Sequence, residues 1–163
     1  MIISLCVPLV LSIGVPLIIH HTGSAVRQRE RRYRWLLYLA CGLFFVSWYL
    51  PSPHIHGQDT SFTTHLVGGG MFTGCLWLYV GYTYRIRMTW AIQLASLFMI
   101  VSALGCLNEL AELLAVELGL VHLTLTDTSW DIVANSLGAL VVWALYTAIT
   151  RAGLAPPHSA GKT

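Results

Sequence analysis

The stretch that decides the fold runs from Cys106 to Ala139 and reads CLNELAELLAVELGLVHLTLTDTSWDIVANSLGA. It places acidic residues in two segments that are otherwise apolar. Glu109 and Glu112 are three positions apart, so they share one face of a helix. Asp131 and Asn135 are four positions apart and share a face of the next helix. Ionisable side chains in apolar helices usually face a bundle interior or a wet cavity, so these two stripes predict a functional site.

The composition around this stretch is that of a membrane protein. The chain has 163 residues, of which 56% are hydrophobic and 10% charged, and its mean hydropathy is +0.68. These values are wrong for a soluble domain of this length and predict a multi-pass protein of the cell membrane, with the lipid bilayer as its first partner. The formal net charge is only +2 and the basic residues fall in short connections. Nucleic-acid binding is therefore not expected.

Apolar runs divide the chain into one all-α domain, residues 1–155, followed by a flexible cytoplasmic tail, 156–163. Four of the five runs are close to the 20 or so residues needed to cross a bilayer, and the fourth in order, 89–118, is longer and could tilt or protrude. The sequence predicts a bundle of five transmembrane helices at about 2–19, 35–50, 64–84, 89–118 and 130–149. Residues 20–34 are expected to form a solvated loop, and Asp127 or Ser129 is a candidate N-cap for a last helix beginning at Trp130.

The basic residues orient these spans. All nine Lys and Arg fall in segments that share one side of a five-span model: five arginines in 27–34, then Arg85, Arg87, Arg151 and Lys162. The positive-inside rule makes that side cytoplasmic, with the amino terminus outside and the carboxyl terminus inside. Six of the seven acids lie at or near the opposite, extracytoplasmic ends, so the cytoplasmic halves are expected to hold almost no buried charge.

The outer ends of the helices collect the candidate site residues. The candidate catalytic residues are His65, Glu109, Glu112 and Asp131, which are also the candidate ligands of a divalent metal ion. Further ligand-binding candidates are Asn135, Asp127 and Asp59. Carboxylates and imidazoles in a low-dielectric bundle are suited to holding a divalent cation, exchanging a proton or binding a polar headgroup, and the residues alone leave these three tasks open.

Simpler interpretations exist for each candidate. His54 and His56 lie beside Pro53 and are more typical of a polar loop than of metal ligands. If the helix end that carries Glu109 and Glu112 emerged among the lipid headgroups, these acids would need no functional explanation. Asp131 would need none if it only complemented the dipole of its helix. Glu109 lies about 14 Å before the expected helix end at 1.5 Å per residue, which favours a buried position.

Glycines predict where two helices meet. Gly70 and Gly74 form a small-xxx-small spacing in the third predicted span. Such a spacing permits close helix contact in a bilayer. We therefore expect both glycines to lie against another helix.

The pattern His65 in THLVGG, Glu109 and Glu112 in NELAEL, and Asp131, Asn135 and Gly138 in WDIVANSLG resembles that of the VanZ-like group of small membrane proteins and the related YjdF-type family. The resemblance covers roughly residues 59–146 and implies a helical membrane fold with an outer site and a role at the cell envelope. In the family an arginine is common in the outer loop before the aspartate. Here Thr124, Thr126 and Asp127 occupy that loop, which weakens any transfer of anionic-ligand binding.

Two functions remain open at this level. In the first, the outer pocket binds or acts on a lipid or lipid-linked envelope component, with a divalent metal ion as a candidate cofactor. In the second, the chain is a non-catalytic accessory or scaffold subunit of a larger membrane complex, and its polar stripes only join helices. A bound metal or lipid would favour the first function, and a stable co-purifying complex would favour the second.

Overall fold

The computed structural model describes residues 2–55, 58–120 and 125–152, with backbone alone for 2–4, 55, 58–59 and 125–127. Its elements are α1 (Ile2–His20), α2 (Ser24–Ser47), β1 (His54–Ile55), β2 (Gln58–Asp59), α3 (Phe62–Thr64), the π-helical segment η1 (His65–Met71), α4 (Phe72–Tyr84), α5 (Trp90–Glu117) and α6 (Leu125–Arg151). β1 and β2 pair antiparallel, with His54 opposite Asp59. The predicted helical class is confirmed. The predicted tail, 156–163, lies outside the described residues.

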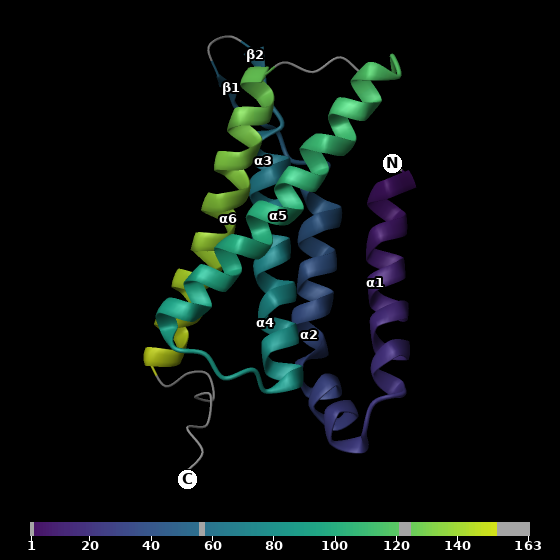
Figure 1. The fold of residues 1–163 in the computed structure, drawn as a ribbon, viewed down its shortest axis with the longest axis vertical. Helices are drawn as coiled ribbons and strands as arrows, with labels where there is room; N and C mark the ends of the chain where they lie inside the picture. The colour runs from purple at the N-terminus through teal and green to yellow at the C-terminus, as the bar shows by residue number, and fades with distance from the viewer. Residues whose placement is uncertain (1, 56–57, 121–124, 153–163) are drawn as a thin grey trace.

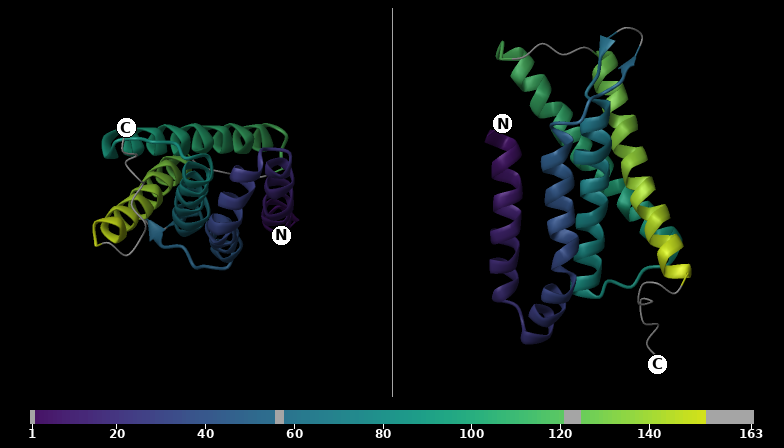
Figure 2. Two further views of the ribbon diagram at one scale, coloured as in Figure 1. Left: turned by 90° about the horizontal axis from the view of Figure 1, so that it is seen from below. Right: turned by 180° about the vertical axis from the view of Figure 1, so that it is seen from behind.

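The helices form a row that is crossed by one further helix. α1, α2, α4 and α6 lie side by side, and α5 runs diagonally across one face of the row (Figure 2). The α1–α2 and α4–α5 connections and the end of α6 lie at one end of the bundle, and the β1–β2 hairpin and the start of α6 lie at the other (Figure 1). The first end carries the described arginines and is called the basic end below; the second is called the hairpin end.

Two helices in the described residues are long and apolar enough to cross a membrane. They are Trp90–Glu117 and Thr128–Arg151, whose most apolar windows have mean hydropathies of 1.9 and 1.8. α1 contributes a shorter apolar helix, Leu5–His20. α2 begins with an arginine-rich turn and α4 is preceded by π-helix instead of α-helix, so neither is one long apolar α-helix.

The solvated loop predicted for residues 20–34 is wrong. α2 begins at Ser24, and Glu30 is buried in it, with 2% of its surface exposed. Arg34, one turn later, donates two hydrogen bonds to the Glu30 carboxylate at 2.7 and 2.6 Å. The hydroxyl of Tyr79 on α4 donates a third at 3.2 Å. The basic end therefore does hold a buried charge, and an i,i+4 ion pair with a hydroxyl donor makes that burial tolerable.

Tyr79→Phe should destabilise the bundle by about 1–2 kcal/mol, because it leaves a buried carboxylate short of a donor while keeping the aromatic ring. The measurement is the thermal midpoint of the detergent-solubilised protein. Tyr49→Phe is the matched control, since Tyr49 is 65% exposed just after the end of α2. Equal midpoints for the Tyr79 and Tyr49 variants would contradict the role given to Glu30.

The start of α6 also differs from the prediction. The helix begins at Leu125, so Asp127 and Ser129 lie inside its first turns and neither is the N-cap of a helix starting at Trp130. Asp127 falls in the first turn, where an acidic residue complements the positive end of the helix dipole. The added turn extends α6 toward the hairpin end.

The glycine prediction is confirmed. A Cβ on Gly74 would lie 2.8 Å from Cβ of Val142 on α6, and a Cβ on Gly70 would lie 2.8 Å from Cα of Gly138 and collide with the carbonyl oxygen of Asn135. These distances are too short for any side chain. η1 can therefore pack with its backbone against that of α6, and Gly74 of α4 packs against the Val142 side chain, which brings the polar residues of α6 up to His65.

Candidate functional site

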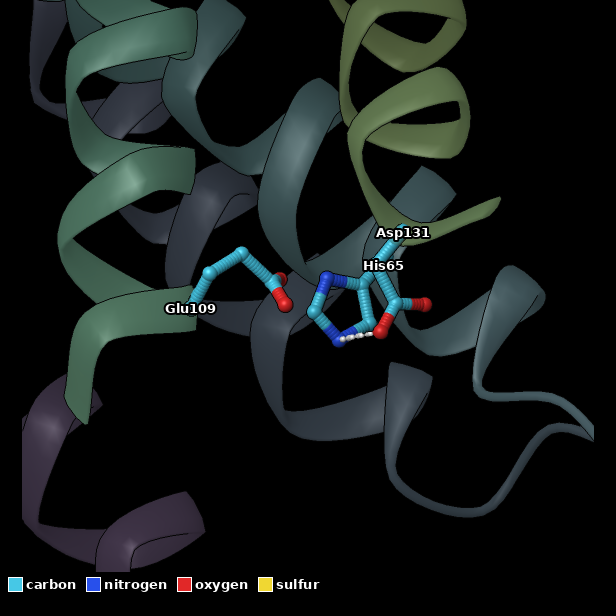
Figure 3. A group of neighbouring side chains, drawn as sticks. All are labelled: His65, Glu109 and Asp131. Atoms are coloured by element: carbon cyan, nitrogen blue, oxygen red, sulfur yellow. Dashed lines mark ion pairs between the residues drawn. The ribbon is translucent and has the colours of Figure 1, made fainter. Parts of the chain in front are cut away.

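Three titratable side chains from three elements meet near the hairpin end of the bundle. His65 begins η1, Glu109 lies on α5 and Asp131 lies on α6. One ligand atom from each lies within 4.8 Å of the others, and the imidazole lies between the two carboxylates (Figure 3). These three residues are called the acid–histidine trio below.

Asp131 is the most buried member of the trio, with 1% of its surface exposed. Its Oδ1 accepts a hydrogen bond of 2.6 Å from the hydroxyl of Ser61, the residue before α3. Its Oδ2 lies 3.4 Å from Nε2 of His65. A buried carboxylate needs partners of this kind to remain charged.

His65 is held on both sides of its ring. Nδ1 lies 3.3 Å from Nδ2 of Asn135 on α6, so in this arrangement Nδ1 accepts and the proton sits on Nε2, facing Asp131. Oδ1 of Asn135 is buried and has no hydrogen-bond partner among the described residues. Turning the Asn135 amide over would let this oxygen accept from a protonated Nδ1, and would direct the lone pair of Nε2 toward the two carboxylates.

The environment of Glu109, the third member of the trio, differs from that of Asp131 and His65. Both carboxylate oxygens are buried and neither accepts a well-formed hydrogen bond from a described residue, although the Thr128 side chain on α6 is close enough to interact with the carboxylate. Leaving a carboxylate in this state is costly unless it is protonated or meets a cation. Glu109 is therefore the member of the trio that most needs a proton or a cation.

The local charge points to a cation. The trio brings two carboxylates together with one imidazole, whereas the lysines and arginines of the sequence belong to 27–34, 85–87, 151 and 162. The described ones lie toward the basic end. A divalent cation beside a neutral imidazole and two carboxylates would bring the site to zero net charge.

A cavity of about 300 Å³ opens beside the trio. His65, Asn135, Gly69 and Gly105 form its wall on the side of the trio. Residues of α2, α3, η1, α4 and α5 contribute to the remainder, among them Phe44, Phe72, Leu104 and Glu112. His65 is thus shared between the trio and a space large enough for a small ligand.

The remaining sequence candidates do not join the trio. Glu112 lies one turn beyond Glu109 on α5, accepts a hydrogen bond of 2.7 Å from Asn108 and lines the cavity. His54 is exposed in β1. The side chains of Asp59 and Asp127, and all of His56, lie outside the described residues. The structure thus brings together His65, Glu109, Asp131 and Asn135 from the predicted set.

Two features of the site were not predicted. Ser61 had no signal in the sequence beyond its place before a helix. The π-helical segment η1 did have a signal in the sequence, which is the glycine run 68–70. A Cβ on Gly69 would collide with Oδ1 of Asn135, so glycine is required where Asn135 reaches His65. Single π-helical turns inside helices often accompany functional sites.

No family model, no curated protein and no solved structure matches this chain. The resemblance to VanZ-like proteins therefore depends on the residues of the pattern alone. Of those residues, His65, Glu109, Asp131 and Asn135 are the ones that meet in space. The function is inferred from this geometry.

Proposed function

We propose that the chain is a VanZ-like, multi-pass protein of the cell membrane with five spans, its amino terminus outside and its carboxyl terminus inside. The trio would then lie in the outer half of the bundle. Two observations support a membrane location and this orientation: two helices are long and apolar enough to cross a bilayer, and the connections that carry arginines share one end of the bundle (Figure 1). A basic end is expected at the cytoplasmic face.

The function we propose is to hold a divalent cation between His65, Glu109 and Asp131 and, with it, to bind or act on a polar lipid component of the cell envelope. The observation that carries this proposal is the Glu109 carboxylate, which is buried with neither oxygen accepting a well-formed hydrogen bond from a described residue, within 4.8 Å of the other two ligand atoms. Imidazole and carboxylate ligands suit Zn²⁺ or Mn²⁺ better than soft metals.

The spacing of the trio is close to that of a metal site. Ligands about 2.1 Å from a tetrahedral ion lie about 3.4 Å apart. Nε2 of His65 and Oδ2 of Asp131 are already 3.4 Å apart. The Glu109 oxygen lies within 4.8 Å of the other two ligand atoms, so it would need to approach by at most about 1.4 Å, a movement within reach of its flexible side chain. Three protein ligands leave a coordination position open, as in catalytic zinc sites.

The residues around the trio have separable roles. Ser61 holds Asp131, and Asn135 fixes the orientation of the His65 ring. Glu109 closes the site from α5. A cation held there would act as a Lewis acid toward a phosphoryl or carbonyl oxygen, and the cavity beside His65 gives such a group access.

The metal content of the purified protein tests this function. The full chain should be purified in mild detergent, dialysed against chelator, and titrated with Zn²⁺, Mn²⁺ and Mg²⁺ while binding is followed by calorimetry. We expect one site per chain that prefers Zn²⁺ or Mn²⁺ to Mg²⁺. A chain that binds none of the three ions, and that co-purifies with other membrane proteins, would instead favour an accessory subunit.

The topology has its own test. A reporter that is active only outside the cytoplasm should be inactive when fused after Lys162 and active when fused in the connection between β1 and β2. The opposite pattern would place the trio in the inner half of the membrane and would remove the extracytoplasmic envelope component from the proposal.

A further inference from the structure

The cavity beside the trio changes from polar to apolar along the bundle axis. On α5, Asn108 and Glu112 line the cavity near the hairpin end. Val101 and Leu104 line it at a level that is closer to the basic end by about two helical turns. The same helix therefore offers a hydrogen-bonding surface at one end of the cavity and a hydrocarbon surface at the other.

The opposite wall repeats this order. Thr64 and His65 lie at the hairpin end, and Phe72, about two helical turns further along the chain, lies toward the basic end. On α2, Phe44 lies closer to the basic end than Ser47. Apart from Thr73, which lies beside Phe72, both walls thus place polar groups toward the hairpin end and apolar groups toward the basic end, which is the distribution of an amphiphile that lies parallel to the helices.

The cavity is open between two helices. α2 and α5 both line it, yet among the described residues these two helices do not pack against each other. The side chains on either side of this gap are substantially exposed, Leu104 at 48% and Trp48 at 44%. A chain held in the cavity could therefore continue along the apolar faces of α2 and α5.

The charge of the lining selects the headgroup. Glu112 is the charged residue of the lining, beside acceptors from Thr64, Asn108 and Asn135, and none of the lining residues is Lys or Arg. A carboxylate in a partly desolvated site attracts an ammonium group and repels a headgroup that carries net negative charge. The cavity thus favours an amine-bearing headgroup over an anionic one.

We infer that this cavity is the binding site of one membrane lipid with an ammonium headgroup, whose amine faces Glu112 and whose first methylenes lie among Phe44, Phe72 and Leu104. A volume of about 300 Å³ is at the lower end of ligand pockets and holds a headgroup with the beginning of a chain. The inference deepens the proposed function and rests on it, because His65 lines the cavity and places the headgroup beside the trio.

The test measures lipid retained by the detergent-solubilised full chain in native mass spectra. The probes are dioleoyl-phosphatidylethanolamine and dioleoyl-phosphatidylglycerol, which share their chains and differ in the headgroup. We expect one retained phosphatidylethanolamine per chain and about tenfold weaker retention of phosphatidylglycerol. Glu112→Gln should remove this preference, and Leu104→Trp should lower the retention of both lipids by filling the apolar end.

Matched controls lie on the same helix. Glu117→Gln and Leu107→Trp change exposed residues of α5 that do not line the cavity, and both should retain phosphatidylethanolamine as the parent does. Leu104→Phe replaces Leu104→Trp if the latter does not fold. Equal retention of the two lipids, unchanged by Glu112→Gln and by the bulky variants, would mean surface lipid only and would overturn the inference.

The metal titration separates this inference from the proposed function. Selective lipid retention without a bound metal ion would leave the cavity assignment standing and refute the cation site. Metal binding without lipid selectivity would leave the cation site standing and refute the cavity assignment. Leu104→Trp should keep its metal affinity while losing lipid, because Leu104 is not a member of the trio.

Discussion

Glu109→Gln should lower the affinity of the purified protein for Zn²⁺ or Mn²⁺ by more than about 100-fold, because removing a metal ligand costs at least as much as removing a residue that merely orients one. The substitution preserves shape and removes the charge that no well-formed hydrogen bond from a described residue now offsets. Without metal, the variant should be as stable as the parent or slightly more stable, since an amide is cheaper to bury than an unpaired carboxylate. Calorimetric titration and the thermal midpoint are the two measurements.

An acid on the same helix provides the control for this result. Glu117→Gln changes an exposed residue at the end of α5. This variant should bind metal as the parent does. A Glu109→Gln protein that binds the ion with the parent's affinity would show that the carboxylate is not a ligand, and the proposed function would lose its main support.

Gly70→Ala should remove most of the folded protein. The added methyl group would meet backbone atoms of α6, the carbonyl oxygen of Asn135 and the Cα of Gly138, and backbone cannot rotate away as a side chain can. Overpacking a well-packed contact typically costs about 1–3 kcal/mol, and a clash between two backbones falls at or above the upper end of that range. The measurement is the yield of monodisperse protein in detergent, with the thermal midpoint of whatever remains.

Gly81→Ala is the control for this variant. Gly81 lies in α4, and a Cβ there would meet no atom within 4 Å, so the substitution should stabilise the helix by roughly 0.5–1 kcal/mol. Equal yields for the Gly70 and Gly81 variants would mean that α6 can shift away from η1. The position of Asn135 against His65 would then not depend on the glycine run.

Helical periodicity made much of the site predictable. Glu109 on one apolar segment and Asp131 with Asn135 on the next are side chains that an apolar helix tolerates only when they face inward. These helices approach His65 in the structure, and Glu109 and Asp131 meet it there. The same periodicity placed Glu112 with Glu109, but a difference of one turn along α5 directs Glu112 into the cavity instead.

Local sequence was misleading where tertiary contacts stabilise a charge. Five arginines near Glu30 suggested a solvated loop, yet Tyr79, forty-nine positions later, supplies a hydrogen bond that helps to bury Glu30 within α2. The residues around Glu30 do not predict a hydrogen-bond donor that lies so far along the chain. The start of α6 was misplaced for a different reason, because Asp127 and Ser129 are equally acceptable as N-caps and as residues of a first turn.

The sequence by itself therefore determined the apolar helical character of the chain, the polar stripes on its last two helices and the close contact at Gly70 and Gly74. Each of these follows from composition or from the period of an α-helix. Only the tertiary structure decided that residues 65–71 form a π-helix, that Ser61 and Asn135 hold the trio, and that Glu109 accepts no well-formed hydrogen bond from any described residue. These features depend on which atoms of distant segments come within a few ångströms, and side-chain distances across helices are fixed by packing and not by periodicity.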